Sequence, residues 1–154
     1  MSITVADILM SVNQKIRTEF PGMKVYGKEI KEGFERPSFF VEIIDEGLEL
    51  HTKNVSLQKG KVGIFYFPAQ KATKGYSESE NLKMADKLIG LFSMVIKVKD
   101  RHLTVKESLM QYEDDIMQMT FSLEFYIRNR IKMPDAELME NVHLEEIKIK
   151  EEVE

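Results

Sequence analysis

Two apolar runs decide the fold of this chain, PSFFVEII at residues 37–44 and VGIFYFP at residues 62–68. Both are rich in aromatic and β-branched residues, which favour strands. Successive side chains of a strand face opposite sides of the sheet, so Phe39 and Val41 should lie opposite Phe40. The second run has the same property, because apolar residues occupy both of its faces. A strand that is apolar on both faces needs cover on both, so the two runs are predicted to form the centre of a sheet.

Length and composition predict one soluble domain. With 154 residues we expect a single domain over residues 1–150, followed by a frayed acidic tail at 151–154. The absence of cysteine excludes disulfides, thiolate metal sites and a cysteine nucleophile. The longest nearly unbroken apolar stretch, Leu88–Ile96, is far shorter than the roughly 18 residues that a membrane span requires. We therefore expect no membrane partner.

Charge is distributed unevenly along the chain. Residues 135–154 hold eight acids and two lysines, whereas the preceding 134 residues hold 18 acids and 20 bases. No basic stripe with interleaved aromatic residues appears in either part. Since such a stripe marks most nucleic-acid-binding surfaces, sequence-specific binding of nucleic acid is disfavoured.

The first forty residues predict a helix and a short strand. Apolar residues recur at helical spacing through Thr4–Glu19, and Thr4 with Asp7 resembles a capping box. Pro21 and Gly22 should end this helix, and an edge strand is expected at Lys24–Tyr26. The expected apolar stripe consists of Val5, Ile8, Leu9, Val12 and Ile16.

Between the two apolar runs, a polar segment predicts a projecting β-hairpin. The first strand is expected to end near Asp45, and residues 46–61 still alternate apolar and polar side chains. We expect arms that extend past the sheet and a mobile tip around residues 51–54.

The next segment predicts the second helix. Ser77 and Glu80 form a capping box, and the helix is expected over Glu78–Lys97. Its apolar face is expected to cover one face of the central strands. That face would consist of Leu82, Ala85, Leu88, Ile89, Phe92, Val95 and Ile96.

The remaining pattern predicts further antiparallel strands. Arg101–Tyr112 is expected to form one strand, interrupted near Glu107 and Ser108. The cleanest alternation follows at residues 117–128, and a last strand is expected at Val142–Ile149 after a break at Pro134. The order of elements indicates an α+β fold with a mainly antiparallel sheet, two amphipathic helices and a long projecting β-hairpin. The apolar side of the alternating strand comprises Met117, Met119, Phe121, Leu123, Phe125 and Ile127.

One pattern is compatible with an enzyme. Asp135, Glu146 and Lys148 match the loose motif of metal-dependent nucleases, in which two carboxylates hold a divalent ion and a lysine assists the attacking water. The motif is degenerate, and here it would join a loop to a terminal edge strand instead of a central hairpin. We therefore favour a protein that is not an enzyme.

No other catalytic, cofactor or metal site is predicted. The three histidines, His51, His102 and His143, are scattered and would have to converge from three different elements to bind a metal. The sequence contains no serine-nucleophile motif and no glycine-rich phosphate loop. The ten methionines are better explained as core filling.

A family resemblance is more specific than these patterns. The stretch YGKEIKEGFERPSFFV at 26–41, with GIFYFP at 63–68, resembles the tail terminator (tail completion) proteins of tailed phages and prophages of Gram-positive bacteria. The resemblance covers roughly residues 3–150 and is weakest at the hairpin, 46–60, and the acidic end. The matching residues are Glu29, Ile30, Gly33, Phe34, Pro37, Phe39, Phe40, Val41, Tyr66, Phe67 and Pro68.

The resemblance implies a structural role. A protein of this family would cap the finished tail tube, stop tube polymerisation and offer a docking face for the head connector, commonly as a hexameric ring. Its partners would be copies of itself, the tail tube protein and the connector, and it would be assembled in the bacterial cytoplasm into the virion tail. Residues 46–60 and 69–76 would then lie at ring or tube contacts. Another head–tail joining protein remains the alternative.

Overall fold

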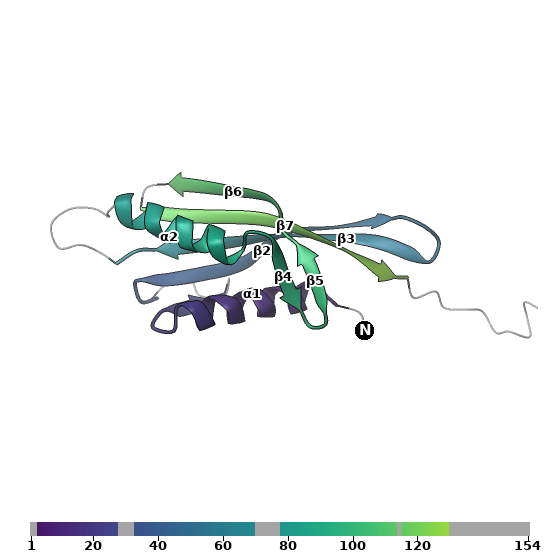
Figure 1. Cartoon of the computed structure of the whole chain (residues 1–154), viewed down its shortest axis with the longest axis horizontal. Helices are drawn as coiled ribbons and strands as arrows, with labels where there is room; N and C mark the ends of the chain where they lie inside the picture. Colours follow the sequence, from purple (N-terminus) through teal and green to yellow (C-terminus); the bar gives the residue numbers. More distant parts are fainter. Residues whose placement is uncertain (1–2, 28–32, 70–77, 114, 130–154) are drawn as a thin grey trace, which may run out of the picture.

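The computed structural model describes residues 3–27, 33–69, 78–113 and 115–129. They form a five-stranded sheet in the order β1-β2-β3-β7-β6, a separate two-stranded hairpin β4-β5, and two helices (Figure 1). The predicted α+β class with a mainly antiparallel sheet is confirmed. The bounds are α1 Val5–Glu19, β1 Lys24–Tyr26, β2 Ser38–Leu50, β3 Val55–Phe67, α2 Glu78–Leu91, β4 Val95–Val98, β5 Arg101–Thr104, β6 Lys106–Glu113 and β7 Ile116–Arg128.

Helix α1 begins and ends where the sequence predicts. Thr4 caps it: the Thr4 N–H donates to Asp7 Oδ2 at 2.8 Å, and the Asp7 N–H donates to the Thr4 hydroxyl at 3.2 Å. This reciprocal box satisfies donors that a helix start leaves unpaired. Ile8, Val12 and Ile16 of the predicted stripe are fully buried.

Of the two apolar runs, the second is the central strand. β3 pairs antiparallel with β2 on one side and β7 on the other. β2 lies one place from the edge, because β1 pairs with it in parallel from Lys24↔Ser38 to Tyr26↔Phe40. The expected end of the first strand near Asp45 is wrong, since β2 continues through a bulge after Ile43 to Leu50. Backbone hydrogen bonds to β3 stabilise the polar second half of β2, from Asp45 to Leu50.

Both helices cover the same face of the sheet. Phe20 at the end of α1 lies against Phe39, with ring centroids 5.2 Å apart, and Phe92 after α2 stacks on Phe121 at 5.4 Å. The predicted alternation of β7 is confirmed, with Ile127 half-buried and the other apolar members fully buried. The core of the protein therefore lies between this face and the two helices.

The opposite face is covered near one end by an aromatic cluster. Phe40 and Phe67 lie 4.7 Å apart between ring centroids, and Phe34 packs edge-on against both, at 4.9 and 5.0 Å. The Arg36 guanidinium lies over the rings of Phe34 and Phe67 and pairs with Asp115 at 2.8 Å. The prediction that both faces of the central strands need cover is confirmed at this end of the sheet. The second face is covered by the loop that contains Phe34 and Arg36, and not by a helix.

Helix α2 is shorter than predicted. It begins at Glu78 but ends at Leu91, and Val95–Val98 forms strand β4 instead of a last helical turn. The sequence VIKV is β-branched at three of four positions, which favours a strand, and its pairing with β5 stabilises that choice.

The buried face of α2 is also rotated from the prediction. Leu82 and Ile89 are 47% and 43% exposed, whereas Asn81 and Met84 are buried. Periodicity alone could not separate the buried stripe from its flanks, because the apolar residues of the helix spread over a wider arc than the buried stripe.

The predicted strand Arg101–Tyr112 is two strands in different sheets. β5 pairs with β4, and β6 pairs with β7. The predicted interruption is confirmed as a register shift between Lys106 and Leu109, where Glu107 has a positive φ of 54°. The chain changes sheet at Val105, whose N–H donates to Met94 O at 2.9 Å.

Several predicted features lie outside the described residues. They are Ser77 of the second capping box, the strand at Val142–Ile149, the tail at 151–154, His143, and the nuclease motif Asp135, Glu146 and Lys148.

Candidate assembly surface

The β2–β3 hairpin extends well past the helices. Pairing continues along both arms to Leu50↔Ser56, and in Figure 1 the hairpin reaches beyond the start of α1. β7 pairs beside it as far as Val55↔Arg128, so the extension is a three-stranded continuation of the sheet. The predicted projecting hairpin is confirmed, with a strand supporting one of its arms.

Asn129, directly after β7, ties down the tip of this hairpin. Its N–H donates to Asn54 O at 2.7 Å, and its side-chain amide donates to Thr52 O and Lys53 O at 3.3 and 3.1 Å. The Ser56 hydroxyl donates to Asn129 Oδ1 at 2.6 Å. The sequence prediction gave Asn129 no role. The sequence feature that could have indicated this role is an asparagine directly after a strongly alternating strand.

The two faces of the extension differ in chemistry. On the face that carries the helices, Leu48 and Leu50 are 64% and 72% exposed. The other face carries charges that pair with one another, such as Lys59 with Glu49 at 3.4 Å. A leucine pair open to water at the end of a hairpin is a candidate contact surface.

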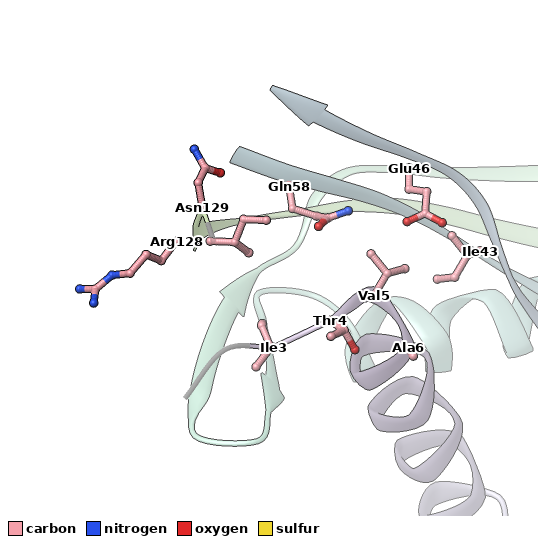
Figure 2. Close-up of a pocket in the computed structure, with 10 residues that line it drawn as sticks. Ile3, Thr4, Val5, Ala6, Ile43, Glu46, Gln58, Arg128 and Asn129 are labelled. Atoms are coloured by element: carbon pink, nitrogen blue, oxygen red, sulfur yellow. The ribbon is translucent and has the colours of Figure 1, made fainter. Parts of the chain in front are cut away.

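A groove of about 780 Å³ lies at the root of the extension (Figure 2). The start of α1 forms one wall of the groove, and strands β2, β3 and β7 form its floor. In Figure 2, Val5 from α1 and Ile43 from β2 approach each other across it, while the Arg128 guanidinium points outward. Gly60 leaves this part of the groove open, because a Cβ at position 60 would contact the Val5 methyl carbons at 3.9 Å.

The outer edge of β2 is a second open feature. β1 pairs only with Ser38–Phe40, so residues 41–50 have no partner on that side within the described parts of the chain. An unpaired edge can accept a strand from another chain. It carries four acids and no base, namely Glu42, Asp45, Glu46 and Glu49.

Among the described residues, the pKa values of two ionisable groups are shifted, and both shifts have structural causes. The Thr4 N–H holds the pKa of Asp7 below its ordinary value, with help from the Thr4 hydroxyl and from Lys99, whose Nζ lies 3.2 Å away. Burial, and secondarily the charge of Glu80, raises the pKa of Tyr66 to about 12. Both groups hold elements together and neither faces a cleft.

The described side chains offer no metal site or membrane helix. His51 packs edge-on against Tyr126 at 5.4 Å, and His102 lies on β5. Within the described ranges, no three His, Asp or Glu side chains gather as metal ligands would. None of the helices there has the length and apolarity needed to cross a bilayer.

The fold and its surface define a small α+β protein, whose candidate binding features are a strand extension, an open strand edge and a groove. The chain belongs to the phage tail terminator proteins, because the model of that family matches residues 7–135. No curated protein matches the chain. Among the solved structures that match, one aligns with 86% of this chain and all of its own, at 12% identity and a TM-score of 0.40.

Family membership confirms the resemblance to tail terminator proteins. The protein is a structural component of the phage tail, and this class is not enzymatic. Most apolar side chains of the runs themselves lie in the core or in the aromatic cluster.

Proposed function

We propose that this protein caps the finished tail tube, stops the addition of tube subunits and presents a docking face to the head connector. The observation that carries the proposal is the family match over residues 7–135. The partners are the tail tube protein, the connector and further copies of this chain, arranged as a hexameric ring.

The form of the molecule supports a ring. Heterologous contacts around a rotation axis need two different surfaces on each subunit. The strand extension with exposed Leu48 and Leu50 is one such surface, and the opposite edge of the sheet, β6, is another. We place the ring or tube contacts in residues 46–60 and 69–76, of which 70–76 lie outside the described residues.

Other finer features belong to the same proposal. Residues 1–150 act as one domain with a short acidic end. The resemblance of the sequence at residues 26–41 to tail terminators of phages of Gram-positive bacteria supports a Gram-positive host. Assembly takes place in the cytoplasm of that host, and the product resides in the virion tail.

Tails made without this protein provide the decisive test. Electron micrographs of particles from a host that lacks the gene should show tails longer than normal, with a broad distribution of lengths. Tails of normal length that fail to join heads would contradict termination and would favour the alternative, a connector role. Complementation with the intact gene is the control.

The ring is tested on the tube itself. Purified protein mixed with tail tubes should add a terminal ring with six-fold symmetry in averaged images, and further tube growth from that end should stop. Light scattering of the isolated protein gives its state before it meets the tube. A tube that keeps growing with the protein bound at its end would overturn the capping proposal.

A further inference from the structure

A basic segment runs through the β4–β5 hairpin to the first residue of β6. Its sequence, KVKDRHLTVK at residues 97–106, contains four lysine or arginine residues, one histidine and one acid. Two of the lysines are neutralised by carboxylates elsewhere in the chain. The other two cations, Lys97 and Arg101, have no carboxylate within ion-pair distance among the described side chains. The hairpin therefore keeps positive charge that its own chain does not neutralise.

The outer face of this hairpin is also partly apolar. The alternate residues Ile96 and Val98 are buried in the core. Val95 and Lys97 point the other way, because successive side chains of a strand face opposite sides. Val95 is 40% exposed, and Met94, directly before β4, is 73% exposed. This face thus combines aliphatic side chains with an exposed cation.

The outer edge of β2 carries the complementary chemistry. One of its four acids pairs with a lysine of β3, and the other three have no cation partner among the described side chains. The exposed side chains of Leu48 and Leu50 lie next to them on the same strand. This edge therefore combines aliphatic side chains with free acids. The three unpaired acids are Glu42, Asp45 and Glu46.

The two surfaces lie on different sides of the strand extension. The strands of the extension follow one another in the order β2, β3 and β7, with the acidic edge on the outside of β2. The hairpin lies beside β7, where the Arg101 guanidinium donates to Tyr126 O at 3.1 Å. The chain passes from β5 into β6 after one residue, so the hairpin adjoins the β6 side of the sheet. Two copies placed side by side in the same orientation can therefore bring the acidic edge of one to the hairpin of the next.

We propose that residues 45–50 at the outer edge of β2 in one copy pack against the outer face of the β4–β5 hairpin in the next copy. The acids then face Lys97, and the two leucines contact Met94 and Val95. The inference rests on the proposed ring and names the two unlike surfaces that close it. Exposed ion pairs are weak when they act singly, so the contact forms where the tube already holds two subunits side by side.

Cross-linking tests the contact in the full chain, which contains no cysteine. One protein carries Gly47→Cys at the acidic edge, and a second carries Thr104→Cys on the hairpin, opposite Val95. The two proteins are mixed on tail tubes and treated with a short bifunctional maleimide. The control mixture replaces the second protein with Lys83→Cys, at an exposed position of α2. We expect at least about fivefold more linked chains in the first mixture, because adjacent thiols react at a high effective concentration.

Charge reversal tests the chemistry of the contact. Glu46→Lys and Lys97→Glu, each added to both cysteine proteins, should lower the cross-linking yield about threefold or more, because each sets like charges against one another. Both changes together in every chain should restore most of the yield, since the pair is then reversed. The matched controls are Asp86→Lys and Lys83→Glu, two exposed and oppositely charged positions of α2, and they should leave the yield unchanged.

The outcomes separate this inference from the ring itself. Equal yields in the edge–hairpin and control mixtures would overturn the inference, and so would equal losses from the charge controls. A chain that carries both Gly47→Cys and Thr104→Cys is also diluted into an excess of unmodified protein, and a link within that single chain would overturn it as well. Six-fold rings that form without the edge–hairpin link would leave the proposed function intact, whereas no ring with unmodified protein would refute the ring and this contact together.

Discussion

Ser56 and Asn129 lie far apart in the sequence and join the hairpin to the end of the neighbouring strand. The Ser56 hydroxyl is 2.6 Å from Asn129 Oδ1, and Ser56 itself is buried. Together with the bonds from Asn129 to the tip, this contact stabilises the far end of the extension. A surface presented to a large assembly needs such support, since ordering it only on binding would cost affinity.

Asn129→Ala should therefore loosen the hairpin tip. We expect a loss of about 1–2 kcal/mol in the free energy of unfolding, since several modest hydrogen bonds disappear together. Hydrogen exchange of residues 51–56 should accelerate more than that of the core. Arg128→Ala, at an exposed neighbour, is the control and should change neither quantity. Equal exchange in both variants would show that Asn129 does not hold the tip.

Gly63→Ala tests a close approach on the face opposite the helices. A Cβ at Gly63 would lie 2.5 Å from Ile44 Cδ1 and 2.9 Å from its Cγ1. We expect a cost of about 1–3 kcal/mol in urea denaturation, as for other overpacked sites. Shortening the neighbour with Ile44→Ala should recover most of it in the double variant. Gly47→Ala, which meets nothing within 4 Å, should be close to neutral.

Arg36 combines an ion pair with packing on two rings. Arg36→Ala should lower the free energy of unfolding by about 1–3 kcal/mol, because Asp115 keeps its partly buried charge while losing a donor. Arg36→Lys keeps the charge but not the flat stacking over Phe34 and Phe67, and should recover only part of the loss. Full recovery by lysine would mean that the stacking is not important.

The lowered pKa of Asp7 predicts that the free energy of unfolding decreases at acidic pH. Its pKa is lowered in the folded state, so its contribution is present above the ordinary value of 3.8 and is lost as pH falls through the lower folded value. The difference in unfolding free energy between wild type and Asp7→Asn should be largest near neutral pH and should shrink below pH 3.8. Asp86→Asn, on the exposed side of α2, is the control. A difference that does not vary with pH would contradict this account.

Leu48 and Leu50 should be important in assembly and not in folding. Replacing both with Asp should alter the free energy of unfolding by less than about 0.5 kcal/mol per site, as expected at exposed positions. Binding to tail tubes should weaken by at least about tenfold if both side chains become buried there. Asp at Gln14 and Thr18, two exposed positions elsewhere, adds the same charge as a control. Unchanged tube binding would remove the leucine pair from the contact surface.

Local patterns predicted most of the elements, and the failures share a cause. The strict alternation of residues 117–127 and the cap at Thr4 determine their structure locally, and both predictions were correct. The helix predicted to Lys97 failed because residues 95–98 are stabilised by pairing with β5, a partner that local periodicity does not reveal. The continuation of β2 to Leu50 depends on β3 in the same way.

The candidate surface was only partly predictable. The sequence indicated a projecting hairpin between residues 46 and 61. It could not indicate the tie from Asn129, because that contact depends on where β7 ends beside the tip. The groove could not be foreseen either, since its walls come from the start of α1 and from three strands distant in sequence.

The open edge of β2 has a consequence for the timing of assembly. Its four acids would face like charges if two such edges met, so free subunits should repel one another along this strand. A complementary surface must bring cations. Added salt should then screen the repulsion between free subunits and weaken attachment to a basic partner. We therefore expect this edge to keep free subunits apart until they meet a surface of opposite charge on the growing particle.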